Sequence, residues 1–267
     1  RVEVAFRAGD TGETQFVVPQ RRRSESDKPA VTGLEALSEQ TEVGTQRDNG
    51  LYPIRHEPDS VVRVAYRLRG LPAPDEPTNR YGPFALEHGW YFEGSTVFAH
   101  PKSMHPGLER PVQLDWRDLP GKWHAVGSLG TYESHQTLET ALGAVQNAMF
   151  VLGNLQNLEM QVADSTITVA MLGEGEPDAT MDPQSRLTDG VLALVRAQRE
   201  FWGATDLPPY LVSLLAPEEC CWSTGTTKYH AIATIIARDE RVKRKDALHA
   251  LVAHEHLHRW LPSKMGS

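Results

Sequence analysis

Residues 246–262 read DALHALVAHEHLHRWLP, and this stretch decides how the rest of the sequence is interpreted. Its apolar residues recur at helical spacing, which predicts a helix near the C-terminal end of the sequence. Asp246 is the expected N-cap and Pro262 marks the expected end, so the helix has about four turns. The residues expected to pack this helix onto a core are Leu248, Leu251 and Val252.

Four histidines and one glutamate divide between the two sides of this helix. Successive helical residues lie about 100° apart, so His254 and His258 project from one face, one turn apart. Glu255 lies beside that pair, whereas His256 and His249 point to the opposite side. Two imidazoles at this spacing can share one tetrahedral zinc ion about 2 Å from each, and the neighbouring carboxylate can act as a general base.

The pattern is His-Glu-x-x-His, which is typical of zinc peptidases. We therefore predict that His254 and His258 bind zinc and that Glu255 takes a proton from a zinc-activated water. The alternative is that both histidines are partly buried core residues, because the sequence contains 11 histidines. The extended metzincin signature fails, since Leu261 and Lys264 stand where it requires Gly and His, so a third ligand must come from elsewhere.

The N-terminal part of the sequence is organised as strands and turns. In VVRVAYRLRG, residues 61–70, apolar and basic residues alternate, which predicts a half-buried strand. Further aromatic segments punctuated by Pro and Gly follow, with Trp90, Trp116 and Trp123 as expected core residues. We predict an antiparallel β-sandwich domain over residues 1–155.

Strands and helices alternate after residue 155. STITVAMLG, YLVSLLAP and KYHAIATIIA are expected strands, and RLTDGVLALVRAQREFWG is an expected helix. The apolar stripe expected on that helix consists of Leu187, Val191, Leu194, Val195, Phe201 and Trp202. An α+β fold is predicted, in which residues 156–267 form the start of a catalytic domain.

Composition excludes some classes of function. The 267 residues include 27 Lys and Arg against 35 Asp and Glu, so the net charge of -8 argues against a nucleic-acid partner. No apolar run is long enough to predict a membrane span. The two cysteines, Cys220 and Cys221, are adjacent and are interpreted as structural, with a metal or redox role as the alternative; they leave the compartment open.

The segment ALVAHEHLHRWLP resembles the active-site helix of gluzincin peptidases, and more closely that of the M61 family of glycyl aminopeptidase-like zinc metallopeptidases. VQLDWRDLPGKWHAVGSLG is similar to a segment of that family's N-terminal β domain, and LTDGVLALVRAQREFWGATDLPPYLVSLL to the opening of its thermolysin-like catalytic domain. The resemblance implies that the third zinc ligand is a glutamate on a following helix, beyond residue 267. It also implies that the sequence is the N-terminal part of a longer enzyme, and bacterial relatives of this kind are often periplasmic or secreted.

The resemblance also points to a strand that binds substrate. In such aminopeptidases a Gly-rich strand before the zinc helix carries an acid that holds the substrate's free amine. The matching stretch is STGTTKYHA, where Gly225 is present but Lys228 stands at or near the position of the acid. If Lys228 faces the cleft it suits a substrate carboxylate, and the alternative is a solvated lysine on an edge strand.

Two functions follow from these observations. The first is a zinc-dependent peptidase, in particular an aminopeptidase acting on peptide substrates, with Glu255 as base. The second is a non-catalytic binding or structural module with a degenerate peptidase lobe, which is suggested by the missing third ligand and the missing acid. The sequence does not indicate an oligomeric state.

Overall fold

A computed structural model gives the fold of the chain. It describes residues 1–19, 31–70, 83–86, 88–132, 134–162, 165–173, 183–203, 207–216, 224–228, 230–235 and 245–258. Cys220 and Cys221 lie outside the described residues. Among the described residues, no helix combines the length and apolarity needed to cross a bilayer.

The N-terminal residues form two antiparallel sheets that share one core. One sheet has the order β1 (Val2–Arg7), β6 (Val61–Leu68) and β3 (Val31–Ala36). The other has the order β4 (Glu42–Val43), β5 (Tyr52–Arg55), β2 (Glu13–Val17) and β9 (His100–Pro101). Side chains of both sheets meet in a single buried cluster, so the predicted sandwich is confirmed.

The alternation in β6 explains how this core forms. Val62, Val64 and Tyr66 are almost completely buried, while Arg63 and Arg67 are exposed, as the period of two predicts. Ala65, on the expected exposed face, is also buried. The Tyr66 hydroxyl donates to the Val97 carbonyl and accepts from the Ala99 amide, and burial raises the pKa of this phenol far above its usual value.

A second antiparallel unit follows along the chain. Its five-stranded sheet has the order β12 (Gly130–Tyr132), β11 (His124–Gly127), β14 (Met149–Gly153), β8 (Gly89–Glu93) and β7 (Phe84–Leu86). A hairpin of β10 (Glu109–Asp115) and β13 (His135–Ala141) and two short helices, α1 (Gly94–Val97) and α2 (Leu142–Asn147), accompany it. As predicted, the tryptophans pack against its aromatic core; they are Trp90, Trp116 and Trp123.

The C-terminal residues form a mixed sheet, which we call the C-terminal sheet. Its order is β15 (Gln156–Val162), β16 (Ser165–Gly173), β17 (Tyr210–Ala216), β19 (Ala231–Ile235) and β18 (Thr224–Lys228). β16, β17 and β19 run parallel, and β15 and β18 are antiparallel edge strands. The three predicted strands are present, the strand that the resemblance places in STGTTKYHA is β18, and β15 is an additional one.

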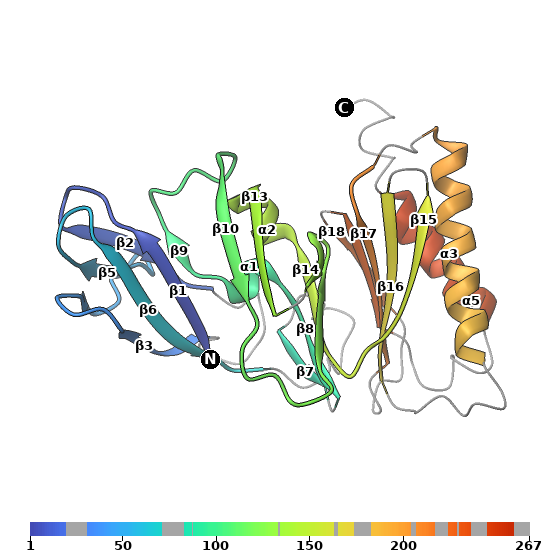
Figure 1. Ribbon diagram of the computed structural model, residues 1–267, viewed down its shortest axis with the longest axis horizontal. Coiled ribbons are helices and arrows are strands. Elements are labelled where there is room, and N and C mark those ends of the chain that lie inside the picture. The colour runs from blue at the N-terminus through green and yellow to red at the C-terminus, as the bar shows by residue number, and fades with distance from the viewer. Residues whose placement is uncertain are drawn as a thin grey trace.

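The two faces of the C-terminal sheet are covered differently (Figure 1). On one face lie the helices α3 (Pro183–Phe201) and α5 (Lys245–Leu257), which bury Val191, Val195 and Val252 against the strands. On the other face, the sheet that contains β8 and β14 packs onto the C-terminal sheet through a second apolar cluster, which includes Tyr91 and Val151. We call these the helix side and the sandwich side.

Three local expectations need correction. α5 begins at Lys245, so Asp246 lies in its first turn and is not the N-cap, and the helix ends at Leu257. On α3, Phe201 is 80% exposed, because it occupies the last helical position, where the stripe leaves the sheet. Leu192, which was not part of the predicted stripe, is buried. The domain boundary at residue 155 stays a prediction, and it falls between β14 and β15.

Candidate metal centre

The candidate centre forms where α5 crosses the edge strand β18. Gly225 lies directly beneath the Glu255 side chain, and a Cβ atom at residue 225 would be 2.4 Å from Glu255 Cγ. Only glycine allows a strand to approach a helical side chain this closely. The close packing of Glu255, the predicted base, against β18 therefore explains why residue 225 is a glycine.

Glu255 is held by the same strand. Its residue is only 8% exposed. The Thr227 hydroxyl lies 2.6 Å from the Glu255 backbone oxygen and 3.1 Å from carboxylate oxygen Oε2, and both oxygens are acceptors. Because Gly225 and Thr227 are two residues apart on one strand, both face α5. The strand therefore limits the positions available to the carboxylate.

His254 and His258 lie on the exposed side of α5, whereas His256 is completely buried. The Nε2 atoms of His254 and His258 are 3.1 Å apart, and their rings are nearly perpendicular. Two nitrogens on a tetrahedral zinc ion, each at roughly 2.0–2.1 Å from the metal, would be about 3.3 Å apart. The two side chains thus lie at the separation that this geometry requires.

The donor set fits a zinc ion. Among the described residues, one group of three offers ligand atoms within 4.8 Å of one another, and it consists of His254, Glu255 and His258. Two neutral imidazoles are good zinc ligands, and a carboxylate that is hydrogen-bonded elsewhere is available as a base. A mononuclear catalytic zinc site usually has three protein ligands, so the two histidines account for part of the set.

Lys228 does not face Glu255. As the neighbour of Thr227 on β18, it projects to the sandwich side, where its Nζ atom lies 3.3 Å from Oε2 of Glu93 at the end of β8. Glu93 is 2% exposed, and the Lys228 side chain is 21% exposed. Lys228 does lie on an edge strand, and its ammonium group forms an ion pair with a buried carboxylate across the junction of the two sheets.

Two contacts of β18 were not anticipated. Thr227 could have been inferred, because it shares a strand face with Gly225. Glu93 could not, since it precedes Lys228 by more than a hundred residues and no local pattern links them. The centre itself is thus assembled from one helix, α5, and one edge strand, β18.

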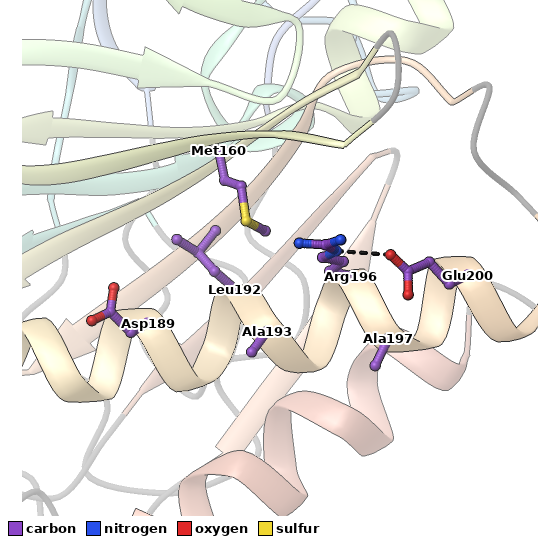
Figure 2. Close-up of a pocket in the computed structure, with 7 residues that line it drawn as sticks. All are labelled: Met160, Asp189, Leu192, Ala193, Arg196, Ala197 and Glu200. Atoms are coloured by element: carbon purple, nitrogen blue, oxygen red, sulfur yellow. Dashed lines mark hydrogen bonds and ion pairs between the residues drawn. The ribbon is translucent and has the colours of Figure 1, made fainter.

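A surface hollow elsewhere does not belong to this centre. It lies between α3 and β15, has a volume of about 330 Å³, and is lined by Met160, Asp189, Leu192, Ala193, Arg196, Ala197 and Glu200. Figure 2 shows these residues, with Arg196 paired to Glu200 at 2.7 Å on the outer face of α3. None of the candidate site residues lines this hollow, so it has no part in the chemistry considered below.

Comparison with known proteins adds information on the fold. No protein-family model matches the sequence, and no curated protein is similar to it. Among solved structures, an aminopeptidase N family protein from Idiomarina loihiensis superposes with a TM-score of 0.72 and 12% sequence identity. That alignment covers 97% of this chain and 44% of the other. The chain therefore spans less than half the length of that structural neighbour.

Two further solved structures superpose less well. The M1 zinc metallopeptidase from Deinococcus radiodurans gives a TM-score of 0.43 at 14% identity, covering 95% of this chain and 59% of the other. A two-domain M1 zinc metallopeptidase mutant bound to L-arginine gives a TM-score of 0.45 at 14% identity, with the same coverage. The fold assignment rests on the Idiomarina structure. The chain shares the fold of that part of the Idiomarina protein, with an antiparallel β sandwich followed by a mixed sheet that carries two helices.

Proposed function

We propose that this chain provides the zinc-binding helix and the general base of a zinc-dependent peptidase. The observation that carries the proposal is the arrangement on α5, where His254 and His258 present two nitrogens 3.1 Å apart beside the enclosed carboxylate of Glu255. The likeness in fold to an aminopeptidase N family protein supports it independently. In the complete protein, a glutamate beyond residue 267 is the proposed third ligand.

Each residue has a defined task in this proposal. His254 and His258 would hold zinc, which polarises a peptide carbonyl and acidifies water when bound. Glu255 accepts a proton from the attacking water and transfers it to the leaving amine. The Thr227 hydroxyl has one hydrogen to donate to either the Glu255 backbone oxygen or Oε2, and its position against the carboxylate limits where Glu255 can turn. Gly225 leaves the space that Glu255 occupies.

We propose further that the enzyme is an aminopeptidase of the M61 type. The M61 part of the proposal rests on the resemblance of ALVAHEHLHRWLP to the active-site helix of that family alone. The aminopeptidase part is also supported by the likeness in fold to an aminopeptidase N family protein. A cation at Lys228 would oppose binding of a substrate's ammonium group. The pairing of Lys228 with Glu93 lessens this difficulty, because the charge of the lysine is compensated on the sandwich side. Export from the cytoplasm is proposed from the same resemblance.

Peptide hydrolysis by the complete protein tests the proposal. Amino-acid amides and N-blocked peptides serve as substrates, and Glu255→Gln is compared with Glu200→Gln, an exposed residue on α3. We expect Glu255→Gln to lower kcat by at least about 1,000-fold, since a general base contributes about 10²–10⁴-fold, and Glu200→Gln to have no effect. Equal rates for Glu255→Gln and the unchanged protein would exclude the assigned base, and no hydrolysis by the unchanged protein would favour the non-catalytic module.

A further inference from the structure

The side-chain amide of Gln198 on α3 forms two hydrogen bonds to the buried side of α5. Gln198 Nε2 donates to the Ala253 carbonyl at 3.2 Å, and Gln198 Oε1 lies 2.5 Å from His256 Nδ1. Because an amide oxygen only accepts, Nδ1 of His256 carries the hydrogen of this bond. Both polar ends of one side chain are thus engaged by the same helix, three residues apart.

The His256 ring also contacts a side chain of the C-terminal sheet. It packs edge-to-face on Tyr210 at the start of β17, with the ring centroids 5.0 Å apart. Arg199 lies over Tyr210 at 5.1 Å and donates to the Ser165 hydroxyl at 2.8 Å. His256, Arg199 and Tyr210 are all almost completely buried. A polar layer therefore lies between α3, α5 and the first residues of β16 and β17.

The anchored positions flank the candidate metal centre in the sequence. Ala253 directly precedes His254, and His256 directly follows Glu255. Positions three apart on a helix lie about 60° from each other, so the two anchors share one side of α5. A ligand atom about 6 Å from the helix axis moves by about 1 Å when the helix rotates by 10°. Such a displacement exceeds the tolerance of about 0.5 Å for a functional site.

We propose that Gln198 is a positioning residue: by holding Ala253 and His256, it fixes the rotation of α5 that places His254 and His258 beside each other and Glu255 against β18. The inference rests on the proposed zinc function. It assigns Gln198 and His256 to the support of the metal site, although neither side chain contacts the proposed ligands in the described contacts.

The test measures metal binding by the complete protein. Gln198→Met keeps the length of the side chain and removes both hydrogen bonds, and Gln198→Glu keeps an acceptor for His256 but cannot donate to Ala253. Arg196→Met, on the exposed side of α3, is the matched control (Figure 2). Zinc affinity is measured by competition with a chelator, and the visible spectrum of the Co²⁺-loaded protein reports the ligand geometry.

We expect Gln198→Met to bind zinc about tenfold more weakly and to change the Co²⁺ spectrum, in line with the effect of other supporting residues at metal sites. Gln198→Glu should fall between Gln198→Met and the unchanged protein, and Arg196→Met should match the unchanged protein. Thermal unfolding of each metal-free variant separates positioning from stability. If Gln198→Met does not fold, the test rests on Gln198→Glu alone. A zinc affinity of Gln198→Glu below that of the unchanged protein would then support the positioning role of Gln198.

Two results would overturn the inference, and they differ in meaning. Unchanged zinc affinity and spectrum in both Gln198 variants, with or without a lower melting temperature, would reduce Gln198 to a packing residue while the proposed function stands. If the unchanged protein binds no zinc, or binds it as tightly after His258→Ala, the proposed function itself fails and the positioning role fails with it.

Discussion

The helix side and the sandwich side of the C-terminal sheet each carry an apolar cluster, but the two sides differ in the polar groups that accompany it. On the helix side, the apolar contacts of α3 and α5 are interrupted by polar contacts at Glu255, Thr227 and Gln198. On the sandwich side the cluster is apolar, with the Lys228–Glu93 pair at its edge. One strand, β18, serves both sides because its side chains alternate. Thr227, which contacts the proposed base Glu255, and Lys228, which pairs with Glu93 of the neighbouring sheet, are therefore adjacent residues of β18.

The largest effect on stability is expected from the ion pair on the sandwich side. Lys228→Met leaves the Glu93 carboxylate buried without the ammonium group, which should lower the free energy of unfolding by about 3 kcal/mol. Because the two residues are coupled, adding Glu93→Gln should recover most of the loss. Denaturant unfolding of the single and double variants measures this. Strict additivity of the two changes would show that the pair does not hold the junction.

On the helix side, Gly225→Ala is expected to affect catalysis more than stability. The new Cβ must displace Glu255, so kcat should fall by about 100-fold, equivalent to about 2.7 kcal/mol in the barrier. Gly121→Ala is the control, since a Cβ there meets no atom within 4 Å. Steady-state kinetics on the complete protein decide the matter, and an unchanged kcat would refute the close packing of β18 against Glu255.

A matched pair of core substitutions sharpens the difference between the sides. Val252 on the helix side and Val151 on the sandwich side are both fully buried, so each change to alanine should lower the free energy of unfolding by about 2 kcal/mol. Only Val252→Ala should lower the activity of the folded fraction, because it loosens α5. Equal activity losses in both variants would contradict the division of tasks.

The smallest effect is expected outside both sides, at Asp115 on β10. A hydrogen bond from His135, and then the charges of His135 and Arg117, hold the pKa of the Asp115 carboxyl below its usual value of about 3.9. The stabilisation is therefore present above pH 4 and is lost as the pH falls through the lower, folded-state pKa. Asp115 is exposed, so Asp115→Asn should change the melting-temperature difference between pH 6 and pH 3 by no more than about 2 °C. A larger change would mean that the hairpin depends on this pair.

Local patterns predicted the elements better than their partners. The alternation in VVRVAYRLRG predicted β6, and the spacing in DALHALVAHEHLHRWLP predicted α5 and the separation of His256 from His254 and His258. Phe201 was misplaced because periodicity does not show where a helix leaves its sheet. The pairing of Lys228 with Glu93 and of Gln198 with His256 depends on distant segments, so no local pattern contained it.

Zinc analysis of the complete protein tests the central claim most directly, namely that the exposed side of α5 is a metal site. The account predicts about one zinc per chain in the unchanged protein and in His135→Ala, an exposed histidine on the distant β13 hairpin, and almost none in His258→Ala. Equal zinc content in His258→Ala and the unchanged protein, or no zinc in either, would contradict it.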